Sequence, residues 1–132
     1  MLKKTNAQFA IEFIVLISFM FIIFLGFTAI VTTKIIEAKE LKRQEIAEDI
    51  ATLAKNEIDL AGSVIDGYMR NFDLPPMVEG NTYTIEIIDN RELAVNYQDM
   101  EHVFFLKDNV IGNLSIGTNM LRKENGIVYV NI

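Results

Sequence analysis

The chain of 132 residues contains no cysteine, a single histidine and two prolines. Without cysteine it can form no disulfide bond, no thiolate metal site and no cysteine nucleophile. His102 has no identifiable catalytic partners, so we interpret it as a strand-edge or partly buried imidazole. A glycine-rich phosphate loop after a strand and a metal-ligand spacing are also missing. We therefore predict that the protein is not an enzyme and uses no metal or cofactor; an unusual carboxylate site is the catalytic alternative left open.

Basic residues are also in short supply. The chain has 12 Lys and Arg residues against 18 Asp and Glu residues, a formal net charge of −6. A protein that binds nucleic acid through its phosphates needs a basic surface. We therefore expect no nucleic-acid partner and an acidic outer surface.

Charge is missing altogether from one long apolar run, Phe13 to Thr33. As a helix rising about 1.5 Å per residue, it can cross a hydrocarbon layer of about 30 Å. An ordinary signal peptide has a shorter apolar region followed by a small-residue cleavage site, whereas Lys34 follows this run directly. The run is therefore predicted to be a membrane segment or a filament core. Basic residues on both sides leave its orientation open.

Glu12 lies one residue before this run and follows the apolar residues Phe9, Ala10 and Ile11. A charged side chain at bilayer depth costs about 2.5 to 3.5 kcal/mol on insertion scales, and less near the interface. The acid therefore either meets a partner or reaches the interface as part of an ordinary anchor.

Apolar residues at three- and four-residue spacings predict an amphipathic helix over residues 34–73. The predicted stripe is Ile46, Ile50, Leu53, Ala54, Ile58, Ala61, Ile65 and Tyr68. The charged side chains of the other face are expected to be solvated. Leu74-Pro75-Pro76-Met77 is expected to end the helix, and Gly26 and Gly62 are the expected places for a bend or break.

Residues 74–132 have the pattern of a small β-rich head with about four to six strands. Alternating apolar residues at 82–87 and 91–97 flank Asp89-Asn90 and predict an antiparallel hairpin. Further extended segments are expected at 102–106, 113–116 and 127–130, with a turn at Asn125-Gly126. A sheet this small is marginal alone, so we expect it to pack on the apolar stripe. The predicted fold class is α+β: a long N-terminal helix, apolar in its first half and amphipathic in its second, packed against an antiparallel β-sheet head.

The N-terminal segment reads Ala7-Gln8-Phe9-Ala10-Ile11-Glu12-Phe13-Ile14-Val15-Leu16 and is preceded by Lys3-Lys4. This segment resembles the class III signal peptide of archaeal type IV pilins. Ala10 departs from the pattern, because the family often has serine there. The later part of the chain is also similar to small pilins of this group, at Pro75-Pro76, residues 112–119 and Glu124-Asn125-Gly126.

The resemblance implies that a prepilin peptidase removes residues 1–7 by cutting between Ala7 and Gln8. Glu12 then becomes the fifth mature residue, which in this family is a glutamate. The resemblance further implies that Glu12 helps to satisfy the new α-amine of a neighbouring subunit, so that the charge is paired within a bundle of apolar helices. Processing leaves 10 basic and 18 acidic residues, a side-chain charge of −8.

On this resemblance, Lys3, Lys4, Gln8, Glu12 and Leu16 serve recognition and assembly. Residues 8–33 form the membrane segment and later the filament core. The implied function is that of a pilin, the structural subunit of a surface filament for adhesion or surface attachment. Its partners would be identical or related subunits, the prepilin peptidase, the pilus assembly ATPase and its membrane platform, and lipid before assembly.

The precursor would lie in the cytoplasmic membrane with its N-terminus inside and its head outside, and the mature form in an extracellular filament. Asn113 begins the sequon Asn113-Leu114-Ser115 and is a candidate glycan acceptor in an exported protein. Gly26 and Ala29 could permit a close helix approach. The alternative from another class is an uncleaved single-pass membrane protein with a small extracellular binding domain, which would retain residues 1–7.

Overall fold

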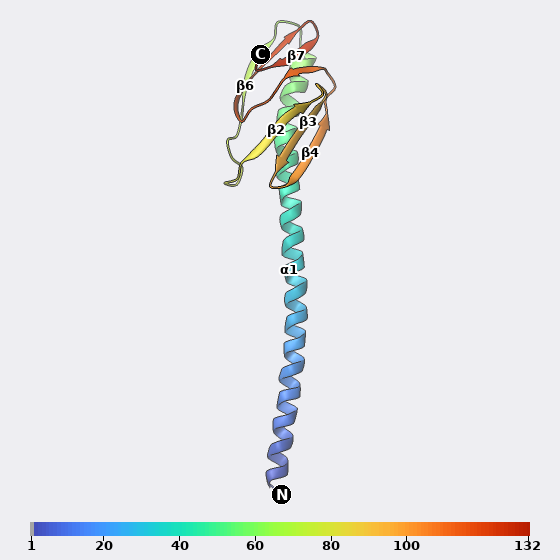
Figure 1. Ribbon diagram of the computed structural model, residues 1–132, viewed down its shortest axis with the longest axis vertical. Coiled ribbons are helices and arrows are strands. Elements are labelled where there is room, and N and C mark those ends of the chain that lie inside the picture. Colours follow the sequence, from blue (N-terminus) through green and yellow to red (C-terminus); the bar gives the residue numbers. More distant parts are fainter. Residues whose placement is uncertain (1) are drawn as a thin grey trace. The chain divides into compact units, whose positions relative to one another are not determined.

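The computed structural model describes the backbone from Leu2 to Ile132 and the side chains from Asn6 onward. The chain forms one helix followed by seven strands, which confirms the α+β class. Figure 1 shows the ribbon coloured along the sequence. The elements are α1 (Leu2–Ser63), β1 (Met69–Leu74), β2 (Tyr83–Ile88), β3 (Glu92–Tyr97), β4 (Met100–Phe105), β5 (Val110–Gly112), β6 (Gly117–Glu124) and β7 (Ile127–Val130). The chain divides into two units, one ending at Lys39 and one from Glu40 to Ile132. We call the second unit the head.

The first unit contains only helix. Every residue from Asn6 to Lys39 is exposed, and α1 continues through Gly26 without a break. A side chain at Gly26 would meet no atom of this chain. This part of α1 therefore buries none of its described side chains within a single copy of the protein.

The part of α1 that belongs to the head has one buried face. It consists of Ala47, Ile50, Ala51, Ala54, Ile58 and Ala61. The predicted stripe is confirmed at Ile50, Ala54, Ile58 and Ala61, while Leu53 is 43% exposed. The prediction missed two alanines of this face, Ala47 and Ala51, which are both fully buried.

The helix ends at Ser63 rather than at residue 73, so the predicted boundary is wrong. A side chain at Gly62 would collide with the carboxylate of Asp108. The Lys123 ammonium then donates hydrogen bonds to the carbonyl oxygens of Gly62, at 2.6 Å, and Val64, at 2.8 Å. The carbonyl of Gly62 belongs to the last helical turn, where carbonyls lack amide partners, and Val64 follows the end of the helix. Tertiary contacts thus end the helix well before Pro75.

Ile65 and Tyr68 accordingly lie beyond the helix. Ile65 is 86% exposed and does not belong to the core, whereas Tyr68 packs against it in part. Residues 69–73, predicted as helix, belong to β1 instead. The two prolines follow this strand and do not end a helix.

The strands form two sheets rather than one. The first has the order β1-β6-β7-β5, and the second is the antiparallel sheet β2-β3-β4. All pairs are antiparallel except β5 and β7, which pair in parallel. The expected segment at 113–116 is not a strand, because its place is taken by a loop between β5 and β6. Three strands that were not predicted, β1, β5 and β6, raise the number to seven.

The two predicted turns are confirmed. Asp89 and Asn90 have φ values of 50° and 61° between β2 and β3. Asn125 and Gly126 have φ values of 52° and 76° between β6 and β7. Two successive residues with positive φ produce the turn that suits the twist of a tight hairpin.

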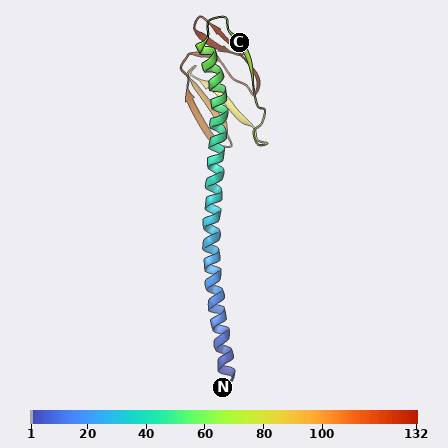
Figure 2. The ribbon, with the colours of Figure 1, turned by 180° about the vertical axis from the view of Figure 1, so that it is seen from behind.

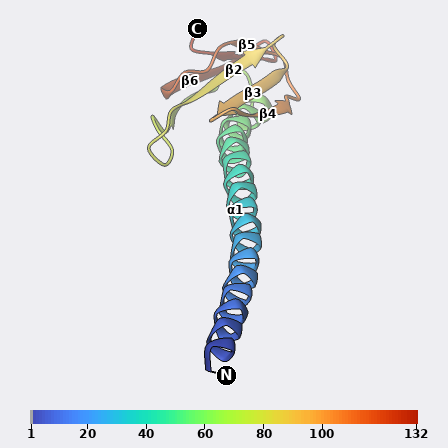
Figure 3. The same cartoon turned by 60° about the horizontal axis from the view of Figure 1, so that its bottom comes forward.

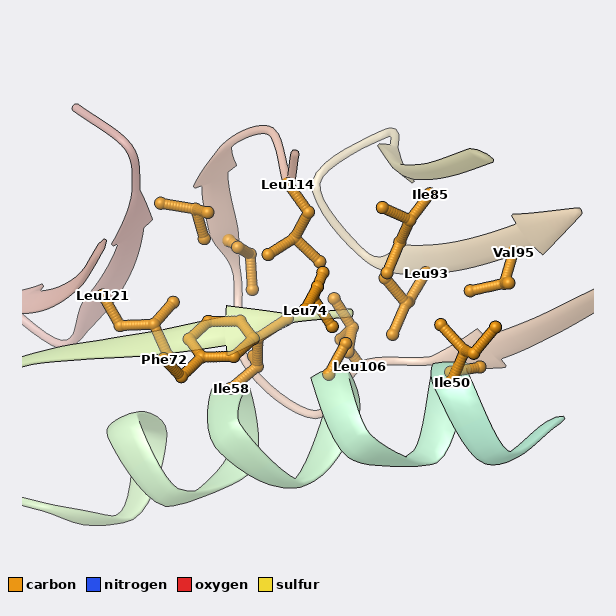
Figure 4. Close-up of a cluster of buried hydrophobic side chains, with 14 of the residues drawn as sticks. Ile50, Ile58, Phe72, Leu74, Ile85, Leu93, Val95, Leu106, Leu114 and Leu121 are labelled. Atoms are coloured by element: carbon orange, nitrogen blue, oxygen red, sulfur yellow. The ribbon is translucent and has the colours of Figure 1, made fainter. Parts of the chain in front are cut away.

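Within the head, both sheets cover the same side of α1. The helix lies behind the strands in Figure 1 and in front of them in Figure 2. Figure 3 shows β2, β3 and β4 side by side as one sheet. Figure 4 shows Ile50 and Ile58 of α1 directed toward Phe72, Leu74, Leu93 and Leu106. The predicted packing of the sheet on the apolar stripe is confirmed.

Candidate processing and assembly site

The predicted processing site lies near the N-terminal end of α1. Ala7 and Gln8 are both exposed helical residues. The peptide bond between them is therefore in the helix and not in an irregular segment. The side chains of Lys3 and Lys4 lie outside the described residues.

Gln8 and Glu12 interact along the helix. The Gln8 side-chain amide Nε2 donates a hydrogen bond of 3.3 Å to Glu12 Oε1. Residues four apart lie on the same helix face, and Leu16 continues that face one turn later. Gln8, Glu12 and Leu16 thus share one exposed face of α1. In the uncleaved chain the carboxylate already has one neutral hydrogen-bond partner.

The hydroxyl groups of the apolar run are satisfied within the helix. Ser18 donates to the carbonyl of Ile14 at 2.8 Å, and Thr28 donates to that of Phe24 at 2.9 Å. Thr32 and Thr33 bond in the same way to Thr28 and Ala29, at 2.8 and 3.0 Å. A buried hydroxyl without a partner is costly in an apolar medium, and these bonds remove that cost.

Glu12 is consequently the one ionic group of residues 8–33, whose other polar groups are neutral. Among the described residues, α1 is the one helix long and apolar enough to cross a membrane. Its exposed large side chains include Phe9, Phe13, Leu16, Phe19 and Phe24. A helix that is apolar all round belongs in lipid or among other helices. The structure therefore supports a membrane-compatible N-terminal helix with a single acid at its start.

Asn113 lies on the exposed loop between β5 and β6. Its side-chain oxygen accepts hydrogen bonds from the backbone amides of Ile87, at 2.8 Å, and Leu114, at 3.0 Å. It thereby joins β2 to the loop. Its side-chain nitrogen, which would carry a glycan, forms none of the described hydrogen bonds. The bonds to its oxygen and a sugar on its nitrogen are chemically compatible, because glycosylation retains the amide carbonyl.

His102 lies on β4, an edge strand of the three-stranded sheet, and is partly buried. Its ring contacts Phe104 edge-on, with 4.6 Å between the ring centroids. The interpretation of His102 as a strand-edge or partly buried imidazole is confirmed. No group of three or more His, Asp or Glu residues that could hold a metal ion occurs among the described side chains.

Two polar side chains, Asn119 and Asn131, fix loops of the head through hydrogen bonds that the sequence did not indicate. The buried Asn119 accepts from the Ser115 amide at 2.8 Å and donates to the carbonyls of Ser115, at 2.7 Å, and Gly117, at 3.0 Å. Asn131 donates to the Asn119 oxygen at 2.9 Å and thereby ties the C-terminal residues to the same loop. No periodicity reveals such bonds, because they join residues across a turn and a strand pair.

Three side chains bind the loop from Pro75 to Asn81, namely Tyr83, Tyr97 and Lys42. Tyr83 donates its hydroxyl to the carbonyl of Pro75 at 2.7 Å, and Tyr97 donates to that of Val78 at 3.1 Å. Glu79 forms an ion pair of 2.8 Å with Lys42 of α1. The hydrogen bond to Glu79 and its negative charge raise the pKa of Lys42, while burial raises the pKa of Tyr83.

No family model, no curated protein and no solved structure matches the chain. The functional interpretation therefore rests on the residues and geometry described above.

Proposed function

We propose that this chain is a pilin, a structural subunit of a type IV pilus-like surface filament. In this proposal the prepilin peptidase cuts between Ala7 and Gln8, and the helix from Gln8 to Thr33 moves from lipid into the filament core. Identical or related subunits, the assembly ATPase and its membrane platform are the remaining partners. The mature protein then lies on the cell surface and serves adhesion or attachment.

One observation carries the proposal. Gln8, Glu12 and Leu16 share one face at the start of a helix whose hydroxyl groups are all internally bonded and whose apolar side chains are all exposed. Such a segment needs neighbours on every side once it leaves lipid, and Glu12 is the one group there that can form an ion pair. The new α-amine of a neighbouring subunit would supply the positive charge.

The uncleaved membrane-anchored protein is the second candidate. It is favoured by the hydrogen bond from Gln8 to Glu12, because this bond gives the carboxylate a partner without any processing. Its small head would then act as a binding domain. The two candidates differ in whether residues 1–7 remain in the exported protein.

Replacing Glu12 by Ala tests the assembly role. We expect Glu12→Ala to insert in the membrane and keep a folded head, yet to form no filaments, because the α-amine of the next subunit loses its partner. Filaments are counted by electron microscopy of sheared cell-surface material, and membrane insertion is measured by fractionation.

Glu48→Ala is the matched control, since it removes an exposed acid of the same helix outside the apolar run. It should leave filaments intact. Normal filaments from Glu12→Ala would contradict the assigned role of this carboxylate.

A further inference from the structure

Charge is divided unequally between two stretches beyond the apolar run. Residues 34–43, which we call the collar, contain four basic and two acidic residues. Residues 44–132 contain six basic and 15 acidic residues, a net charge of −9. A basic segment thus directly precedes a strongly acidic domain in the chain.

The outer face of the sheet β2-β3-β4 combines this negative charge with apolar surface. Side chains alternate between the two faces of a strand, and the inner set packs in the core. Phe105 is 73% exposed and Val103 is 40% exposed on the outer face. Phe105 pairs in register with Glu92, and Val103 with Ala94, which in turn pairs with Glu86. Exposed apolar atoms therefore lie directly beside carboxylates.

The collar also exposes apolar side chains, but its charge is positive where that of the sheet face is negative. Leu41 is 67% exposed, and Ile35 and Ile36 are more than half exposed. Lys39 and Arg43 form no ion pair among the described side chains, and neither do Glu86, Glu92 and Glu101. The collar thus offers apolar side chains beside free positive charges.

One collar residue already binds a carboxylate of the head. Lys42 forms its 2.8 Å ion pair with Glu79 of the same chain. Because the head begins at Glu40, both partners of this ion pair belong to the head of one chain. The ion pair occupies Lys42 alone and leaves Lys39 and Arg43 for another copy.

We propose that the outer face of β2-β3-β4 docks on the collar of a second copy of this chain. The inference rests on the proposed filament function and names a contact outside the apolar core. Because the two surfaces differ, the contact is head-to-tail and repeats from copy to copy instead of closing into a dimer. Opposite charges set the orientation, and the apolar side chains lose their water.

The absence of native cysteine makes the contact directly testable. Two full-length variants, Phe105→Cys and Leu41→Cys, are co-expressed, and the surface material is mildly oxidised. We expect a disulfide-linked dimer from the mixture and none from either variant alone. A dimer from Phe105→Cys alone would mean that two sheet faces meet, and it would overturn the proposal.

The matched control pairs Leu41→Cys with Ile65→Cys, which places the thiol at an exposed apolar position outside both surfaces. This pair should give no crosslink. If wild-type filaments form but the 41–105 dimer is absent, the docking proposal alone fails. If the protein is exported uncleaved and forms no filaments, the proposed function fails with it.

A charge exchange tests whether opposite charges join the two copies. Introducing Lys39→Glu and Arg43→Glu beside Leu41→Cys should lower the crosslink to the level of the control pair. Adding Glu92→Lys and Glu101→Lys to the Phe105→Cys partner should restore it. A crosslink that is indifferent to both exchanges would show that the opposite charges do not join two copies, and it would overturn the proposal.

Discussion

The helical unit up to Lys39 and the head from Glu40 onward differ in where their apolar side chains lie: the head buries a core of them within one copy, and those described in the helical unit are exposed. The head buries Leu93, Val95, Leu121, Val128 and other apolar side chains against α1. The helical unit leaves every described side chain exposed, although it is the more apolar of the two. A chain can thus carry one domain that is complete in a single copy and one segment that is complete only in lipid or among other helices. The head depends on its own packing, whereas the helical unit depends on its surroundings.

Breaking the core of the head should have the largest effect on its stability. Leu93 is fully buried in β3, and Leu93→Ala removes contacts and leaves a cavity. We expect a loss of about 2 to 5 kcal/mol in the free energy of unfolding, with unchanged membrane retention. Thermal unfolding of the full-length protein in detergent, followed by near-ultraviolet circular dichroism, measures the loss. Leu53→Ala, at a partly exposed site on the same domain, is the control; an equal loss there would contradict the assigned core.

Removing the buried amide of Asn119 should have the next largest effect. Asn119→Ala leaves the Ser115 amide and two backbone carbonyls without their partners inside the head. An unsatisfied buried polar group costs about 1 to 3 kcal/mol. Hydrogen exchange should show faster opening of the loop at 113–117 than of β3. Asn96→Ala, on an exposed site, should change neither quantity, and identical behaviour of the two variants would refute the role given to Asn119.

Removing the Lys123 ammonium, which binds carbonyls at the C-terminal end of α1, should lower the free energy of unfolding by a smaller amount. Lys123→Met keeps the aliphatic stem but loses the hydrogen bonds to the carbonyls of Gly62 and Val64. A cation at a helix C-terminus contributes about 0.3 to 1 kcal/mol, and more when partly buried, so a loss of about 1 kcal/mol is expected. Denaturant unfolding of this variant and of Lys107→Met, at an exposed site, provides the comparison. If the two variants lose the same stability, the lysine does not close the helix.

The smallest predicted effect is a loss of stability at alkaline pH, which should occur in the head and not in the helical unit. The pKa of Tyr83 is raised above 10.0 by burial, and that of Lys42 is raised above 10.5 chiefly by its hydrogen bond to Glu79. A group whose pKa is higher in the folded state contributes stability below its unfolded pKa and loses it as pH rises through the folded pKa. The head should therefore weaken above about pH 10. Tyr83→Phe should lessen this decline, and an unchanged pH dependence in that variant would count against it.

The sequence allowed the local features of the head to be predicted. Alternation marked β2 and β3, and further extended segments were expected where β4 and β7 lie. Turn residues marked the two hairpins, and helical spacing marked four of the buried residues of α1. Each of these signals comes from residues close together in the chain. They required no knowledge of which distant segments meet.

The features that were missed depend on distant contacts. β1 was assigned to the helix because its pairing partner, β6, lies far along the chain, as Met69 opposite Arg122 illustrates. The helix end was placed at the prolines, although Gly62, also named as a place for a break, lies next to the observed end at Ser63. The lysine cap on Gly62 leaves no local trace in the sequence. For the candidate site, the sequence marked Gln8 and Glu12, and the structure added their hydrogen bond. The acidic sheet face needed the strand register before it could be recognised.

The most direct test of the account is the N-terminus of the exported protein. Mass spectrometry of the intact exported protein and of its N-terminal peptide identifies the first residue. It does so even where an N-terminal glutamine has cyclised. The account predicts a chain that begins at Gln8, with residues 1–7 removed. An exported protein that retains Met1 or Leu2 would contradict the pilin assignment and favour the uncleaved membrane anchor.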